Sequence, residues 1–219
     1  MLSNRLWDSI TDIYDAILIH PFIEGLTDGS LSPETFRFYV VQDAHYLRDY
    51  ARALSVCGAK APTPDDVAMF NNHAAGAIAV ERALHSSFFA DFGMSEADVD
   101  TTPVAPTNRA YTSYLLASVY EGSFPEALGA VLPCYWIYSE VGRHLLTSGS
   151  PNPLFQRWIE TYGGDEFAAI VKAVLELTNR VGDDLSPPDE GHVRERFVTT
   201  SRYEWMFWDA AWRRETWPV

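Results

Sequence analysis

The sequence predicts an all-α protein in which long helices joined by short connections form a bundle. Apolar residues recur at helical spacing along most of the 219 residues, and no alternating strand pattern of useful length occurs. With 47% hydrophobic residues, the chain can bury a large core, and its length suits one domain. We therefore expect a single all-α domain that spans residues 1–219.

The N-terminal half is predicted to contain three helices. A first apolar stripe ends at the "HP" of residues 20–21, because the residue before a proline is pushed out of the α region. The "SPE" of residues 32–34 combines a capping serine, a first-turn proline and an acid, so a second helix begins there. The "TPDD" of residues 63–66 repeats this signal for a third helix that runs to Phe88. A connection rich in Pro, Thr and Asp follows near residues 95–107.

The C-terminal half continues the same pattern. Helices are predicted near residues 111–122, 125–145, 155–162 and 167–181, and a last one from about residue 189 into the tail. In the final segment, EWMFWDAAW, large apolar side chains lie around the whole circumference of the helix. Such a helix is either buried on every side or covered by another subunit, so we expect an oligomer.

Composition limits the partners and the compartment. Asp and Glu total 30 against 16 Lys and Arg, giving a net charge of -14 without a basic run, so nucleic acid and anionic membranes are poor partners. No stretch reaches the roughly 18 apolar residues of a membrane span, and the acid-rich first twenty residues do not resemble a signal peptide. Two cysteines are too few for a disulfide scaffold, so we expect a cytoplasmic protein.

Three apolar helical stripes are each interrupted by one reactive side chain. Asp43 interrupts the stripe of the second predicted helix, Cys134 lies in the segment LPCYWIY, and Glu204 interrupts the stripe of the last helix. Burying an unpaired carboxylate costs several kcal/mol or shifts its pKa. The simplest arrangement is therefore a shared polar cavity inside the bundle.

Each of these residues also has a purely structural interpretation. Asp43 could pair with Arg48 or Arg52 near the surface. In the same way, Glu204 could reach an arginine among Arg202, Arg213 and Arg214. Cys134 could be a core cysteine, which is how we interpret Cys57. The coincidence of three such residues on inward faces of different helices favours a functional site.

These residue types suit attack on a flat heteroaromatic ring. A cysteine can add to such a ring, one carboxylate can bind ring nitrogens, and the second can move protons. No cofactor is needed for this chemistry. Tyrosine side chains could sandwich the ring and donate hydrogen bonds to it. The candidates are Tyr46, Tyr111, Tyr138 and Tyr162.

A metal-dependent oxidoreductase of the di-iron bundle type is the alternative enzyme. Three acid and histidine pairs lie about one helical turn apart: Glu81 with His85, Glu140 with His144, and His192 with Glu195. Only the last has the three-residue offset of di-iron ligands, and its order is reversed. Such pairs are ordinary contacts on helix surfaces, so we expect no metal site.

Four segments together resemble the TenA family, known as thiaminase II. They are HPFIEGLTDGSLSPETFRFYVVQDAHYLRDYARAL, AYTSYL, LPCYWIY and YEWMFWDAAW. Their order and spacing extend the resemblance over nearly the whole chain, although residues 86–107 carry no matching motif. The resemblance implies a heme-oxygenase-like helical fold without heme, usually a homotetramer. It also implies hydrolysis of 4-amino-5-aminomethyl-2-methylpyrimidine or thiamin to 4-amino-5-hydroxymethyl-2-methylpyrimidine, a step of thiamin salvage.

The resemblance also implies roles for the reactive residues. By motif position, Cys134 is the nucleophile, Glu204 the acid/base, and Asp43 the anchor for the amino and ring nitrogens of the pyrimidine. The four tyrosines named above would line the pocket. A non-enzymatic protein that binds the thiamin pyrimidine, or a regulatory one, is the remaining alternative.

Overall fold

A computed structural model describes residues 1–80 and 86–219, and within these ranges the chain forms helices and no strands. The prediction of an all-α fold is confirmed. In chain order the helices are α1 (Leu2–Asp8), α2 (Thr11–Leu18), α3 (Pro21–Asp28), α4 (Pro33–Lys60), α5 (Pro64–Val80), α6 (Ser86–Asp91), α7 (Glu96–Thr101), α8 (Pro106–Glu121), α9 (Phe124–Leu146), α10 (Pro153–Gly163), α11 (Asp165–Gly182) and α12 (Pro187–Arg213).

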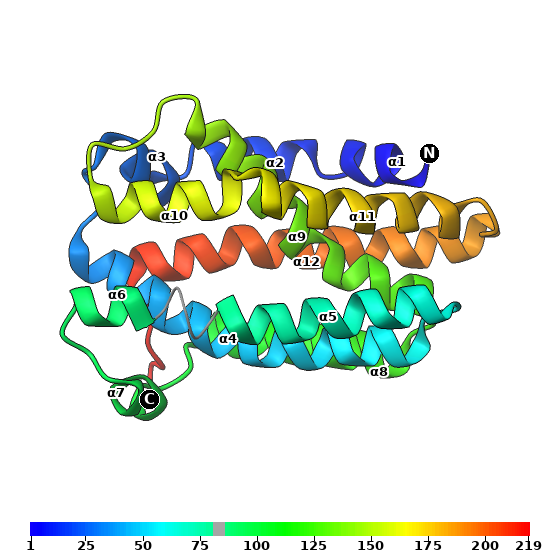
Figure 1. The fold of residues 1–219 in the computed structure, drawn as a ribbon, viewed down its shortest axis with the longest axis horizontal. Helices are drawn as coiled ribbons and strands as arrows, with labels where there is room; N and C mark the ends of the chain where they lie inside the picture. Colours follow the sequence, from blue (N-terminus) through cyan, green and yellow to red (C-terminus); the bar gives the residue numbers. More distant parts are fainter. Residues whose placement is uncertain (81–85) are drawn as a thin grey trace.

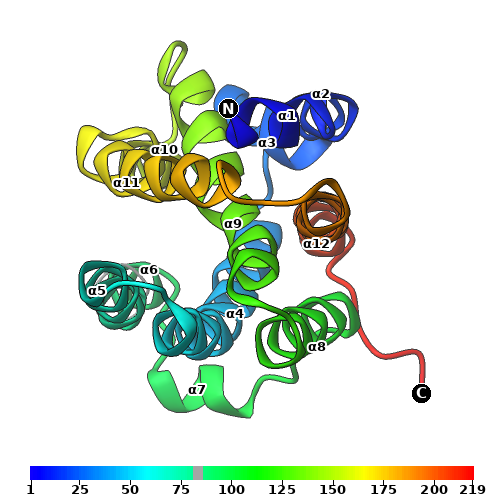
Figure 2. The same cartoon turned by 90° about the vertical axis from the view of Figure 1, so that its right-hand side faces the viewer.

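Helix α9 is the centre of the bundle. It packs against α4, α8, α10, α11 and α12, which surround it in Figures 1 and 2. Two glycines of α9 permit this close packing. A Cβ atom at Gly129 would lie 2.7 Å from the Val193 carbonyl oxygen of α12, and one at Gly142 would lie 2.5 Å from the Gly163 nitrogen of α10. Both distances are too short for a side chain, so glycine is needed where the backbones approach.

Caps mark the helix starts at Pro21 and Pro33, of which only the second was predicted. His20 has an extended backbone before Pro21, and its Nδ1 accepts a hydrogen bond from the Phe22 amide at 3.1 Å. Ser32 accepts one from the Thr35 amide at 3.1 Å, with Pro33 as the first residue of α4. These local signals fix where α3 and α4 begin, and α4 carries Asp43 into the core.

Three segments of the structure differ from the prediction. The first apolar stripe is not one helix, because the Ser9 hydroxyl donates to the Leu6 carbonyl at 2.6 Å and the chain leaves the helical conformation at Ile10. The connection near residues 95–107 contains the short helix α7, which a capping box of Ser95 and Asp98 stabilises. Residues 21–28, which no predicted helix covered, form α3. The third predicted helix falls on α5 and α6, and residues 81–85 lie outside the described residues.

The last helix is covered only on part of its circumference. Phe207 and Trp208 are buried, whereas Met206 is 40% exposed and Trp212 is 43% exposed. Its apolar surface is therefore larger than one copy of the chain buries. Among the described residues, no helix combines the length and the apolar character that crossing a membrane would require.

Candidate active site

A cavity of about 440 Å³ lies between α4, α5, α9, α10 and α11. This volume is in the range of small-molecule sites. Helices α5 and α11 both contribute lining residues. The polar lining residues are Asp43, Tyr50, Asn72, His73, Cys134, Tyr135, Tyr138, Thr161, Tyr162 and Glu166. The rest of the wall is apolar, so the site is a mainly apolar cavity that carries a group of polar side chains.

Four of the seven predicted site residues lie on the cavity wall. Asp43 comes from α4, Cys134 and Tyr138 from α9, and Tyr162 from α10. Asp43 is only 3% exposed. The other three predicted residues are Tyr46, Tyr111 and Glu204, which do not line the cavity. They form a buried layer next to the thiol.

Glu204 is held in this layer by Tyr111. The Tyr111 hydroxyl donates a hydrogen bond to the Glu204 Oε1 atom at 2.5 Å, and Glu204 is 1% exposed. The pKa of Glu204 is raised to about 8, chiefly by burial; the hydrogen bond from Tyr111 opposes this shift, and the negative charge of Asp43 adds to it. Glu204 is therefore mostly protonated near neutral pH and can act as an acid.

Both carboxyl groups act on the Cys134 sulfur. Burial raises the pKa of this thiol well above its usual range, and Glu204 and Asp43 raise it further. The hydroxyl groups of Tyr46 and Tyr50 act in the opposite direction. Tyr50 is fixed there because it donates to the Val131 carbonyl of α9 at 3.0 Å. The thiol and two acids, predicted from three separate segments, thus lie within one electrostatic environment.

Aromatic rings surround the thiol and the cavity. The rings of Tyr138 and Tyr162 lie 4.9 Å apart and are tilted by 56°. Behind the thiol, the rings of Tyr46 and Tyr111 lie 5.0 Å apart. The buried Tyr46 hydroxyl has no hydrogen-bond partner among the described residues, which is uncommon for a buried polar group. This hydroxyl faces the Cys134 thiol, whose pKa it lowers.

Three of the arginines that could have paired with Asp43 or Glu204 bond to other carboxylates instead. Arg48 pairs with Asp100 at 2.6 Å, and Arg52 pairs with Asp49 on its own helix. Arg213 pairs with Asp209 at 2.8 Å, while Glu204 bonds to Tyr111. Cys57 does match the core interpretation, because it is fully buried and its pKa rises to about 12 through burial.

Sequence reasoning missed one polar pair on the cavity wall. The His73 Nδ1 atom of α5 lies 3.0 Å from the Tyr135 hydroxyl oxygen of α9. Tyr135 directly follows Cys134 within the segment LPCYWIY, so its position offered a signal. His73 belongs to no motif and is 62 residues away from its partner, so only the tertiary structure reveals the pair.

The described residues contain no group of three or more His, Cys, Asp or Glu side chains that could hold a metal ion. Glu140 is engaged with Arg143 at 3.1 Å. The pair of Glu81 and His85 lies outside the described residues.

The fold and the cavity define a class: a helical-bundle protein with a thiol and two carboxyl groups gathered beside a ring-sized, aromatic-walled cavity. Comparison with known proteins identifies the family. Residues 7–214 match the TENA/THI-4/PQQC family, to which this chain belongs. The resemblance seen in the sequence is thereby confirmed.

Individual relatives agree in sequence and in fold. The chain is 36% identical over 215 residues to the aminopyrimidine aminohydrolase of Bacillus subtilis (strain 168), covering 98% of this chain and 91% of the relative. It superimposes on the TenA homologue from P. horikoshii with a TM-score of 0.90 at 30% identity, covering 97% and 99% of the two chains. A Shewanella denitrificans domain with a heme oxygenase-like fold gives a TM-score of 0.76 at 18% identity, covering 96% and 92%. The heme-oxygenase-like fold is confirmed.

Proposed function

We propose that this protein hydrolyses aminopyrimidines to 4-amino-5-hydroxymethyl-2-methylpyrimidine in thiamin salvage, with Cys134 as the nucleophile. The observation that carries the proposal is the position of Cys134, on the wall of the cavity and under the influence of Glu204 and Asp43. The activity in the name of the B. subtilis relative supports it.

Binding would place the pyrimidine ring against the Tyr138 and Tyr162 rings. Burial holds the pKa of both tyrosines well above 10, so they stay neutral and can donate hydrogen bonds. Asp43 would accept hydrogen bonds from the amino group and from a protonated ring nitrogen. Both partners of such a bond carry charge, which makes it stronger than a neutral one.

The reaction would begin with a bond between the Cys134 sulfur and a ring carbon. As the electron pair of the adjacent C=N bond moves onto nitrogen, Glu204 donates its proton there and then receives the thiol proton. The electron pair next moves back toward the methylene carbon, and the bond to the leaving group breaks: the amine departs as ammonia from its protonated form, and thiazole departs neutral from the thiazolium. Water then adds to the methylene carbon and releases one proton to a base or to solvent. The sulfur leaves as a thiolate, the ring nitrogen gives its proton back through Glu204 to that thiolate, and the aromatic ring is restored. No proton is gained or lost overall by the enzyme.

A parallel assay tests the function. Purified protein is incubated with 4-amino-5-aminomethyl-2-methylpyrimidine and, separately, with thiamin, and the hydroxymethyl product is followed by chromatography and mass spectrometry. We expect product from at least one substrate. Binding of both compounds without product over hours would favour the alternative of a non-enzymatic pyrimidine-binding or regulatory protein.

Asp43→Asn should weaken substrate binding most. The substitution keeps the size of the side chain but removes a charge-assisted hydrogen bond of about 1.5–3 kcal/mol, so we expect kcat/KM to fall roughly 10- to 150-fold. Steady-state kinetics of Asp43→Asn and of a control variant measure the effect. The control is Asp49→Asn on the same helix, because Asp49 pairs with Arg52 away from the cavity. Equal kinetics for the two variants would remove Asp43 from the site.

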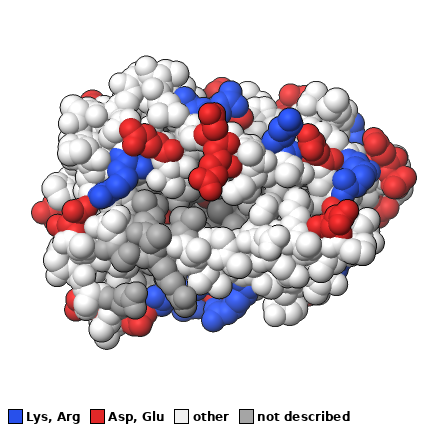
Figure 3. Space-filling model, in the orientation of Figure 1, with Lys and Arg blue, Asp and Glu red and all other residues white. Residues whose placement is uncertain are grey.

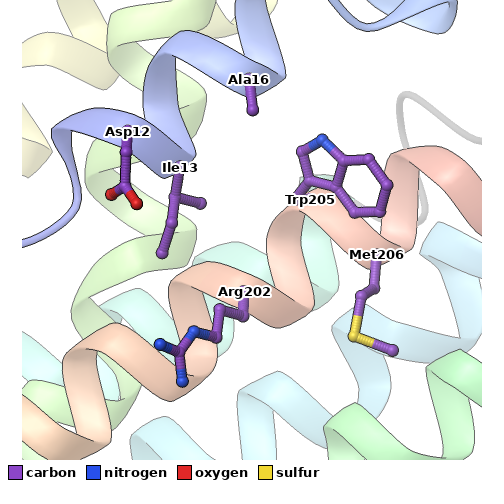
Figure 4. Close-up of a pocket in the computed structure, with 6 residues that line it drawn as sticks. All are labelled: Asp12, Ile13, Ala16, Arg202, Trp205 and Met206. Atoms are coloured by element: carbon purple, nitrogen blue, oxygen red, sulfur yellow. The ribbon is translucent and has the colours of Figure 1, made fainter.

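We also propose a homotetramer in which a groove between α2 and α12 is a contact between copies. The groove measures about 370 Å³, and Figure 4 shows its apolar side chains projecting from both helices. They are Ile13, Ala16, Trp205 and Met206, with Asp12 and Arg202 beside them. A two-fold contact brings the same surface of two copies together, so Asp12 of one copy could pair with Arg202 of the other.

Met206→Glu places a charge in that contact, so a smaller assembly is expected at the same protein concentration. Light scattering coupled to size-exclusion chromatography measures the mass. The control is Tyr120→Glu, since Tyr120 is 66% exposed on α8, away from this groove. A wild-type protein that is monomeric at micromolar concentration contradicts the proposal.

The charge of the chain indicates the kind of partner, and its cysteines indicate the compartment. The chain carries a net charge of -14, and the face in Figure 3 mixes acidic and basic side chains instead of presenting a continuous basic stripe. We therefore propose a small-molecule pyrimidine as the partner, and neither nucleic acid nor a membrane. Because both cysteines are free thiols, we place the protein in the cytoplasm.

A further inference from the structure

We propose that His73, held by Tyr135, is the general base that activates the water molecule replacing the leaving group. This inference rests on the proposed hydrolysis, because it assigns the one step for which Cys134, Glu204 and Asp43 provide no free group. It adds a catalytic residue from α5, a helix that contributes none of the residues named so far in the mechanism.

One nitrogen of His73 can perform this task in the tautomer that carries its proton on Nδ1. The His73 Nδ1 atom lies 3.0 Å from the Tyr135 hydroxyl oxygen, and the two rings lie 5.6 Å apart. When Nδ1 donates to this oxygen, Nε2 is the unprotonated nitrogen of the neutral ring. No described residue is bonded to Nε2, and the side chain lines the cavity. Nε2 is thus available to accept a proton from water.

The other titratable residues that line the cavity are less suited than His73 to accept a proton from water. Burial raises the pKa of the lining tyrosines well above 10, so none of them is a base near neutral pH. Of the remaining groups, Asp43 accepts hydrogen bonds from the pyrimidine ring in the proposed complex. Glu166, in the first turn of α11, is exposed to solvent. Burial lowers the pKa of His73, so its imidazole is neutral at pH 7 and can accept a proton.

The position of His73 also suits the leaving-group side. Asp43, Cys134, Tyr138 and Tyr162 come from α4, α9 and α10, whereas His73 and Asn72 belong to the α5 wall. In the proposed complex, the first four of these residues hold the pyrimidine ring, and its methylene substituent points toward the α5 wall. There, the water oxygen forms a bond to the methylene carbon while one of its protons moves to His73 Nε2. The departing amine, or solvent, then takes this proton, which returns His73 to its neutral form.

Azide provides a direct test, because it is a small anion that can attack the methylene carbon without losing a proton. His73→Ala should lower hydrolysis of the substrate about 100-fold or more. Sodium azide should then restore release of the leaving group, with formation of the azidomethyl pyrimidine, which mass spectrometry detects. Wild-type protein should respond little to azide, and Cys134→Ala should not respond at all.

Two further variants separate catalysis from folding. Tyr135→Phe keeps the ring and removes only the hydroxyl that orients His73, so an intermediate loss of kcat with little change in KM is expected. His45→Gln is the matched control, because His45 is also half-buried but bonds to the Thr102 carbonyl at 3.1 Å outside the cavity. It should retain wild-type kinetics. His73→Gln replaces His73→Ala in the same assay if circular dichroism shows that the alanine variant is unfolded.

The outcomes distinguish this inference from the function on which it rests. A wild-type protein without hydrolysis overturns the proposed function. An active wild-type protein with an equally active His73→Ala variant overturns the role of His73 alone. A folded, inactive variant that azide does not rescue overturns it as well, because a purely structural role predicts that result.

Discussion

Cys134→Ala is expected to lower turnover by at least about 10³-fold while the hydroxymethylpyrimidine product still binds, because the substitution removes the atom that forms the covalent bond. The cavity walls that hold the ring come from Asp43, Tyr138 and Tyr162, which the substitution leaves in place. The dissociation constant should therefore change by no more than about threefold, under 1 kcal/mol. Calorimetry measures binding, and the hydrolysis assay measures turnover.

Cys57→Ala is the matched control for this prediction. Cys57 is the other cysteine of the chain, and it is buried in the core away from the cavity. This variant should lose a little stability and no activity. If Cys134→Ala retained near wild-type rates, the covalent step would be wrong, whereas loss of both binding and turnover would indicate a structural thiol.

Glu204→Gln is expected to lose activity and gain stability in alkaline solution. The amide keeps the size of the side chain, and its carbonyl can still accept the hydrogen bond from Tyr111. It cannot exchange a proton with the ring nitrogen, so we expect kcat to fall about 10²- to 10⁴-fold. An inactive variant that is more stable than the wild-type protein would show that Glu204 is retained for its chemistry.

The stability change has a defined sign and pH window. The pKa of Glu204 is raised from 4.5 to about 8 in the folded protein. Between these values the unfolded chain has lost the proton that the folded chain retains, so wild-type stability falls as the pH rises. A tenfold difference in proton affinity between the two states corresponds to about 1.4 kcal/mol, so the total loss is several kcal/mol by pH 8. Glu204→Gln has no such loss and should be the more stable protein at pH 8.

Urea unfolding at pH 5 and pH 8, at one protein concentration, measures this difference. Glu126→Gln is a control of opposite sign, since the Ser123 backbone amide lowers the pKa of Glu126. That variant should lose nearly the same stability relative to the wild-type protein at pH 5 and pH 8, and this difference should disappear only as the pH falls below 4.5. If Glu204→Gln followed the pH dependence of the wild-type protein, Glu204 would be ionised in the fold and could not be the acid.

The site could be predicted from the sequence to the extent that its signals were local. Asp43, Cys134 and Glu204 each interrupt an apolar stripe, and such an interruption is visible within one helix. By contrast, the pair of His73 and Tyr135 joins two helices that are far apart in the chain, and no spacing rule connects them. The break between α1 and α2 was also missed, because apolar residues continue at helical spacing across it. The helix ends where the Ser9 hydroxyl donates to the Leu6 carbonyl.

The sequence by itself determined the helical class, the capped start of α4, and the kinds of reactive side chain that face inward. These properties depend on residues within a few positions of one another. Only the tertiary structure decided that Glu204 lies behind the cavity wall, bonded to Tyr111 and with a raised pKa, while Asp43 faces the cavity. A pKa and an exposed surface depend on how much water the surrounding helices exclude, and that is settled when distant segments pack together.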